Sequence, residues 1–389
     1  MATANTPAGA NDALKKIVQT TSALISQFEP LLHAAATDKT SSAATPPSSS
    51  STTPQSQTID ALSLAHDSAS LIRAHTTKIS LLIINEPFTP SAVVTVLKEL
   101  IGGPIPGIAS AVQACDVDRY TSVARQDLAW RCYRVLKELR TLIEVIPLNG
   151  KVLSPEKKNG VQGGLGSMTV TGVIWAACDD VILLKKLGIA GLLVQKVEQY
   201  RDTLKDVLDE LKEWKEEGEE ADDEEEEDEV EYVAHQLDAT SLSVQDTQDA
   251  LDDLMSTRHI PKDDPDKLGE RLDSCLKRLR LTTLFYSAVV KRRLKTLPAL
   301  PAEAGSPIVR RLDEVFPILR RLPNKFNELA CAFYELEPGP IDDAMDACFF
   351  DAFAASEMLM KSWAGQKDEF TEWAEKYQVS IKKPEDKEA

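Results

Sequence analysis

The sequence predicts an all-α protein built from two antiparallel helical bundles that are joined by an acidic segment. Apolar residues recur every three or four positions along most of the chain, which is the period of an amphipathic helix. Aromatic residues make up only 6% of the chain, and no segment alternates apolar and polar residues long enough to predict a strand. The length of 389 residues exceeds what one small core supports, so we expect two domains.

In the first half of the chain, the helical pattern is divided by residues that commonly end helices. Pro87 follows the second predicted helix, Pro147 ends the fourth, and Gly188 separates the fifth from the helix after it. The expected helices span residues 11–36, 59–84, 91–100, 108–146 and 168–187.

The clearest periodicity lies in residues 189–214, where one apolar stripe runs along the whole segment. Such a stripe is typical of a long bundle helix packed at a shallow angle. Pairing with a second chain as a coiled coil is the alternative, and the flanking helices favour the bundle. The stripe consists of Ile189, Leu193, Val197, Tyr200, Leu204, Val207, Leu211 and Trp214.

The helical pattern resumes after the acidic segment. Apolar residues at helical spacing predict further helices over residues 230–254, 266–297, 307–333 and 341–377. We expect Pro317 or Pro323 to break the third of these, because proline lacks an amide hydrogen and clashes with the preceding turn.

Three segments interrupt the helices and define the expected domains. Residues 37–57 are a Ser/Thr/Pro tract that we expect to be disordered, and residues 150–167 form a flexible Gly-rich and Lys-rich loop. Residues 216–231 contain 13 acidic residues and no basic one, and repulsion between like charges favours an extended, solvated linker. The predicted domains are an N-terminal helix (1–36), the linker 37–57, a bundle (58–215, joined by helix 11–36), the acidic linker 216–231 and a second bundle (232–380).

The charge of the chain is concentrated in that acidic segment. The formal net charge is −18, but without residues 216–231 the chain would hold 49 acidic residues against 44 basic ones. A protein that binds nucleic acid without sequence preference needs a basic surface, so this balance argues against direct nucleic-acid binding. Basic proteins remain possible partners.

Composition also points to a soluble intracellular protein. The N-terminus lacks the apolar core of a signal peptide, and the six cysteines are scattered without a C-x-x-C pair, as expected for free thiols in a reducing compartment. Uninterrupted apolar runs such as Leu81–Ile84 are much shorter than the ~20 residues that a membrane-spanning helix needs. We therefore expect no membrane span.

No catalytic or metal-binding pattern is present in the sequence. None of the five histidines lies at metal-ligand spacing from another histidine or a cysteine, and no G-x-S-x-G motif occurs. The stretch Gly160–Gly166 lacks the G-K-[ST] ending of a phosphate-binding loop. Adjacent acidic pairs such as Asp179-Asp180 point about 100° apart on a helix and form no acid–base couple. We expect no enzyme activity, no metal and no cofactor.

Two features are candidate interaction sites. The first is the centre of the acidic segment, which either solubilises the chain or attracts a basic protein. Its candidate residues are Glu224, Glu225, Glu226 and Glu227.

The second candidate site is helix 266–297, whose non-apolar side carries many basic residues and is expected to face solvent. The candidate residues there are Arg278, Arg280, Arg292 and Arg293. An ordinary charged helix face is the simpler interpretation. The sharper hypothesis is that the tethered acidic segment folds back on this helix.

Residues Met168–Val181 read MTVTGVIWAACDDV, and a long helix rich in Gln, Arg and Asp follows Gly188 before the acidic segment. This helix–glycine–helix stretch resembles the cyclin-D-interacting protein family. The likeness extends over roughly residues 59–380 and is sharpest at 168–214. The resemblance implies helical bundles of the vinculin and α-catenin type. It also implies binding to cyclin-D-type and helix-loop-helix proteins, negative effects on cell-cycle progression and transcription, and residence in the cytoplasm and nucleus.

The expected function is therefore that of a non-enzymatic, protein-binding regulator. One alternative is a vinculin-like adaptor that links other proteins to the cytoskeleton. The other is an acidic chaperone for histones or other basic proteins, whose binding would depend on residues 216–231 and would weaken with added salt.

Overall fold

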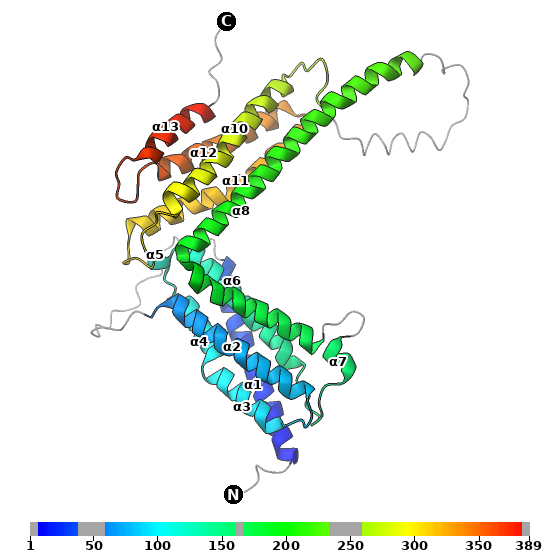
Figure 1. Ribbon diagram of the computed structural model, residues 1–389, viewed down its shortest axis with the longest axis vertical. Helices are drawn as coiled ribbons and strands as arrows, with labels where there is room; N and C mark the ends of the chain where they lie inside the picture. The colour runs from blue at the N-terminus through cyan, green and yellow to red at the C-terminus, as the bar shows by residue number, and fades with distance from the viewer. Residues whose placement is uncertain (1–6, 38–58, 161–165, 233–258, 383–389) are drawn as a thin grey trace. The chain divides into compact units, whose positions relative to one another are not determined.

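The computed structural model describes residues 7–37, 59–160, 166–232 and 259–382, with side chains from residue 9 and not within 219–232 (Figure 1). All regular structure in these residues is helical, with no β-strand among them, which confirms the predicted all-α fold class. Two compact units are present. The first comprises Met1–Leu193 with Ala299–Asp313, and the second comprises Val194–Pro298 with Glu314–Ala389.

The first unit is a bundle in which α1 packs along α6 and α2 packs along α4 (Figure 1). Apolar residues at helical spacing are buried as the sequence predicts; Leu14 on α1, Ile72 on α2 and Leu136 on α6 are all fully buried. The helices of this unit are α1 (Pro7–Thr37), α2 (Ala61–Ile84), α3 (Pro90–Gly102), α4 (Pro104–Ala114), α5 (Val117–Tyr120), α6 (Ser122–Glu144), α7 (Pro155–Asn159) and the first part of α8 (Ser167–Tyr232).

The single helix predicted over residues 108–146 is wrong. The chain forms α4, α5 and α6 in this region, because capping side chains interrupt the helix twice. The Asp116 carboxylate accepts a hydrogen bond from the amide of Asp118, and the Thr121 hydroxyl accepts one from the amide of Ala124. Thr121 has a φ of 91°, which no helical residue adopts.

One stretch of the first unit, Pro90–Ala114, is long and apolar enough to cross a membrane by length and composition, although we expected no such stretch because its apolar runs are short. In the structure this stretch forms two helices, α3 and α4, that meet at Gly103. Val93, Leu97 and Ile108 are fully buried in the unit. Core helices meet the same length and composition criteria, so the stretch is weak evidence for a membrane span.

Helix α8 contributes to both units and bends at Gly188, whose φ and ψ are 66° and 178°. The apolar stripe predicted along residues 189–214 is buried inside the chain; Leu204 and Leu211 are fully buried and Trp214 is 4% exposed. Tyr200 is the exception, since it is only half-buried. Burial within one chain agrees with the bundle interpretation and leaves little apolar surface here for a coiled coil.

The backbone of α8 stays helical to Tyr232, so the acidic residues 216–231 do not begin as the extended linker that we expected. Glutamate is a strong helix former, and like charges one turn apart cost only about 0.2–0.5 kcal/mol per pair. The two compact units divide at Leu193–Val194, inside α8, rather than at the acidic segment. Separation of two domains by the acidic segment stays a prediction.

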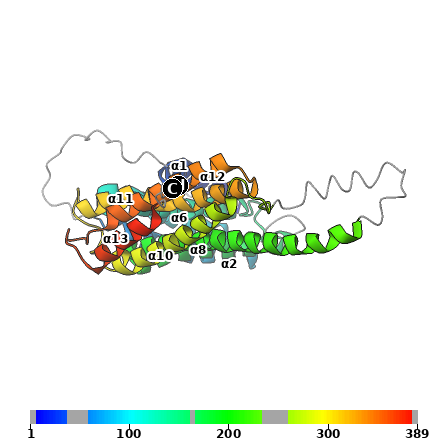
Figure 2. The same ribbon diagram turned by 90° about the horizontal axis from the view of Figure 1, so that it is seen from above.

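The second unit packs the rest of α8 beside α10, and Figures 1 and 2 show these two helices running side by side. An ion pair of 2.9 Å between Lys215 and Asp273 joins them. The further elements of the unit are α10 (Leu268–Val289), the π-helix η1 (Val290–Leu294), most of α11 (Pro307–Tyr334), α12 (Pro338–Leu359) and α13 (Glu369–Ile381).

Three predictions in the second half of the chain differ from the structure. The helix predicted over 266–297 is α-helical only as far as Val289, and residues Val290–Leu294 form a π-helix. The helix predicted over 341–377 is two helices, because Asp368 and Thr371 form a capping box that starts α13. Helix α11 is continuous through Pro317 and Pro323, where we expected a break.

Burial of the apolar side of α11 explains why neither proline ends the helix. Phe316, Leu319 and Leu322 are at most 2% exposed, and this packing compensates for the hydrogen bonds that the prolines cannot make. Most of the predicted helix 230–254 and the whole tract 38–57 lie outside the described residues.

Replacing Gly188 by alanine should destabilise the first unit, because this backbone conformation costs a residue with a side chain about 1–3 kcal/mol. Gly172 is the matched control: it lies within the same helix, and a methyl group added there meets no atom within 4 Å. Gly172→Ala should therefore stabilise the helix by about 0.5–1 kcal/mol. Urea unfolding followed by circular dichroism measures both variants. Equal effects of the two substitutions would contradict the proposed strain at Gly188.

Candidate functional site

The predicted interaction sites differ in how far the structure describes them. Glu224, Glu225, Glu226 and Glu227 lie on the helical backbone at the end of α8, and their side chains are outside the described residues. Docking of the acidic segment on the basic helix therefore stays a prediction. Of the four predicted arginines, Arg280 and Arg292 are exposed, whereas Arg278 and Arg293 are buried.

Arg278 was expected to face solvent but is only 5% exposed. Its guanidinium lies over the ring of Phe349, 3.6 Å from the ring centroid, and donates a hydrogen bond of 2.8 Å to the carbonyl oxygen of Ile381. This carbonyl is one of the unpaired acceptors at the C-terminal end of α13, which a cation stabilises. Arg278 therefore holds α10, α12 and α13 together and is not available to a partner.

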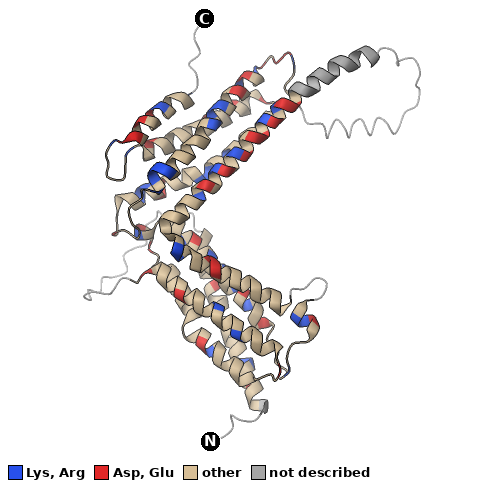
Figure 3. Cartoon of the chain, viewed as in Figure 1, with Lys and Arg blue, Asp and Glu red and all other residues tan. Residues whose placement is uncertain are grey.

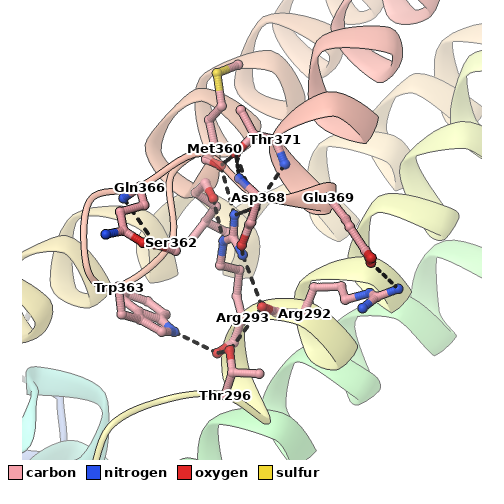
Figure 4. A network of polar contacts seen from close by, with 11 residues as sticks. Arg292, Arg293, Thr296, Met360, Ser362, Trp363, Gln366, Asp368, Glu369 and Thr371 are labelled. Carbon is pink, nitrogen blue, oxygen red and sulfur yellow. Dashed lines mark hydrogen bonds and ion pairs between the residues drawn. The ribbon is translucent and has the colours of Figure 1, made fainter.

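Arg293 is the most deeply buried of the four predicted arginines, at 1% exposure (Figure 4). Its guanidinium donates to both carboxylate oxygens of Asp368, at 2.8 and 2.9 Å, and to the carbonyl oxygens of Leu359 (2.7 Å) and Met360 (2.8 Å). The guanidinium carbon also lies 4.3 Å from the ring centroid of Phe370. These contacts fasten the end of α12 to the start of α13.

The position of Arg293 along the helix is consistent with its burial. At 100° per residue, Arg293 lies five full turns after Cys275 and therefore on the same side of the helix as this fully buried residue. We assigned Arg293 to the solvent-facing side because it is basic, not because of its position. The helix ends here in a π-turn, in which the amide of Lys295 donates a hydrogen bond of 3.0 Å to the carbonyl of Val290. Arg292 stays outside, where it pairs with Glu369 at 3.1 Å.

A more extended surface lies on the first part of α8, in the first unit. Met168, Gly172, Ala176 and Leu183 fall within an arc of about 80° on this helix, and the one charged residue within this arc between Met168 and Leu183 is Asp179. All four are exposed; Met168 is 53% and Leu183 43% exposed. We call this surface the α8 face. Residues 167–178 contain no charged residue, although surface helices of this length normally carry several.

Contacts with α2 hold the α8 face in place. The Thr171 hydroxyl donates a hydrogen bond of 3.1 Å to the hydroxyl of Ser80, and the indole nitrogen of Trp175 donates one of 3.1 Å to the hydroxyl of Thr77. These bonds fix the rotation of α8 about its own axis. The α8 face therefore points outward, because the opposite side of the helix is buried in the bundle core.

The carboxylates beside the α8 face are neutralised by basic residues of the bundle. Asp179 pairs with Arg73 at 2.9 Å, and Asp180 pairs with Arg134 at 3.0 Å. The Arg73 guanidinium also lies 5.5 Å from the centroid of the Trp175 ring. These two ion pairs link α8 to α2 and α6.

A hollow of about 630 Å³ adjoins the α8 face near the bend at Gly188. It is open to solvent and mostly apolar, with charged side chains at its edges. The lining residues are His66, Asp179, Asp180, Ile182, Leu183, Lys185 and Lys186. Among the described residues, no three His, Cys, Asp or Glu side chains are arranged to hold a metal ion. The α8 face and the hollow together provide apolar surface that another molecule could contact.

Charge is distributed unevenly between the helices, as Figure 3 shows for the described residues. The first unit holds 19 basic and 17 acidic residues, so it is close to neutral. The second unit holds 25 basic and 45 acidic residues and therefore carries the acidity of the chain.

Sequence reasoning missed the α8 face, although a signal was present. The uncharged stretch 167–178 and the small residues Gly172 and Ala176, four positions apart, could have predicted an exposed apolar surface. Burial of Arg293 also left a signal, since the residue lies five turns after Cys275, but its partner Asp368 is set by a capping box that the sequence analysis did not predict.

These features define a helical-bundle protein that exposes a largely apolar helix face, as protein-binding domains do. Residues 65–217 match the sequence model of the family described as Grap2 and cyclin-D-interacting, N-terminal. This match includes the whole α8 face, and it confirms the resemblance to the cyclin-D-interacting family.

A curated relative shares part of this region. An uncharacterized protein of Schizosaccharomyces pombe (strain 972 / ATCC 24843) is 27% identical over 146 residues, which cover 37% of this chain and 41% of that protein. The chain thus aligns with less than half of the length of this relative.

Replacing Arg293 by methionine should destabilise the protein by about 3 kcal/mol, because the substitution leaves carbonyl acceptors and Asp368 without their donor. The matched control is Arg292→Met, which removes an exposed ion pair and should cost at most about 1 kcal/mol. Urea unfolding midpoints measure both. If the two substitutions had the same effect, Arg293 would not be the structural anchor described above.

The network also predicts a dependence of stability on pH. The hydrogen bond from Arg293 lowers the pKa of Asp368 to about 2, below the unfolded value of about 3.9. The contribution of this carboxylate is therefore fully present above about pH 4 and is lost as the pH falls towards 2. The difference in unfolding midpoint between wild type and Asp368→Asn should shrink across this range. A difference that stays constant from pH 5 to pH 2 would contradict the assignment.

Proposed function

We propose that this chain is a non-enzymatic regulator that binds protein partners of the cyclin-D type, and that the α8 face is its contact surface. The observation that carries this proposal is the coincidence of two findings. The residues that match the cyclin-D-interacting family include α8 as far as residue 217, and the first part of this helix exposes a face whose one carboxylate is paired with Arg73.

The physical properties of the α8 face support protein binding. Exposed apolar side chains gain free energy when a partner removes them from water, at roughly 25 cal/mol per Å². Gly172 and Ala176 add little bulk between Met168 and Leu183, so a partner can approach the helix backbone closely. Hydrogen bonds to α2 already fix α8, which limits the ordering that binding would require.

The finer parts of the proposal come from the family resemblance. They are binding to helix-loop-helix proteins, an effect on cell-cycle progression and transcription, and residence in both cytoplasm and nucleus. The absence of catalytic function belongs to the same proposal. A protein of this kind would act by occupying a surface of its partner.

The test is direct binding of the purified full-length chain to a purified D-type cyclin, measured by isothermal titration calorimetry. Gly172→Glu places a charge in the middle of the α8 face, and the open space around Gly172 lets the helix accept the new side chain. Desolvation of that charge should weaken binding at least about tenfold.

The matched control is Gly339→Glu on α12, where an added side chain also meets no atom within 4 Å. This variant should bind like wild type. Equal binding by Gly172→Glu would exclude the α8 face as the contact. Loss of binding only on deletion of residues 216–231 would instead favour recognition through the acidic segment.

A further inference from the structure

The α8 face has the length and shape of a binding surface for one helix. Met168 and Leu183 are 15 positions apart, which corresponds to about 22 Å along a helix, or about four turns. The two large side chains stand at the ends and the small residues Gly172 and Ala176 lie between them. A partner helix that crosses at this point can approach to the short interaxial distance that small residues permit.

Basic side chains stand at both ends of this surface. Lys185 and Lys186 border the hollow beside Leu183. At the other end, Lys157 and Lys158 belong to α7, which lies against the start of α8 because the backbone of residues 158–160 contacts Gly166. Within the described part of the chain, no carboxylate lies within ion-pair distance of any of these four lysines.

Acidic residues near the α8 face do not cancel this charge. Asp179 and Asp180 are already paired with Arg73 and Arg134, so their net effect on an approaching partner is small. Glu156 is the one acidic residue within α7 itself, against two lysines. The local field is therefore positive at both ends of a centre whose one carboxylate, Asp179, is paired with Arg73, although the whole chain has a net charge of −18.

We infer that the α8 face binds an amphipathic helix of about four turns from the partner, with an apolar centre and acidic residues at both ends. The apolar side chains would cover Met168, Gly172, Ala176 and Leu183, and the acidic ends would lie against the two lysine pairs. Complementary charge sets the register of the helix and speeds its association. This inference rests on the proposed function, since it specifies the chemistry of the partner at the same surface.

The experiment uses the full-length chain and two synthetic fluorescein-labelled helical peptides that share one leucine-rich apolar face. One peptide carries glutamate at both ends, and the other carries lysine at the same positions. Fluorescence anisotropy should give at least about tenfold tighter binding of the glutamate peptide at low salt, with the gap narrowing as salt is added. Gly172→Glu should weaken both peptides.

Charge reversal provides the specific control. The double variant Lys185→Glu/Lys186→Glu should remove most of the preference for the glutamate peptide. Lys291→Glu/Lys295→Glu, which changes two exposed lysines of the second unit by the same total charge, should leave it unchanged. Equal binding of the two peptides, binding of neither, or an equal effect of both double variants would overturn the inference.

Parallel titration with the D-type cyclin separates this inference from the proposed function. If cyclin binding depends on Gly172 but the peptides show no charge preference, the proposed function stands and the acidic helix is wrong. If the glutamate peptide binds with the expected preference and the cyclin does not, the partner class is wrong and the chemistry of the α8 face is right.

Discussion

The fold depends on the burial of one side of α8. This helix supplies core residues to both compact units, with Ile174 and Val181 buried in the first and Leu204 and Leu211 buried in the second. The bend at Gly188 lets one continuous helix serve two cores, because glycine adopts its positive φ without strain. Because packing constrains only the buried side of α8, the residues on its exposed side are available for binding another molecule. In the first unit that exposed side carries no charged residue from Ser167 to Cys178.

Much of the fold could be predicted from the sequence, because helical periodicity records which side of each helix is buried. The stripe at Leu193, Val197, Leu204 and Leu211 is an example, and each of these residues is fully buried. The errors have local causes that periodicity does not record. Capping by Thr121 divides one predicted helix, whereas packing carries another through two prolines.

The candidate site was less predictable than the fold, for a physical reason. The sequence reports that a residue is basic, but not whether a partner within the chain neutralises it. Arg278 and Arg293 appeared to belong to a solvent-facing surface and instead hold helices together from inside. The α8 face shows the opposite case, where the informative signal was the absence of charge over residues 167–178. What binds there depends on complementary features of another molecule, which this sequence does not contain.

The cysteines have a practical consequence for work with this protein. Five of the six are buried free thiols, and burial raises the pKa of Cys115, Cys178 and Cys275 to about 12. Thiols react as thiolates, so these side chains are both shielded and chemically inert near neutral pH. Cys331, on α11, is exposed. A maleimide dye should therefore attach to the unmodified chain at this one position, which provides a native fluorescent reporter without any substitution.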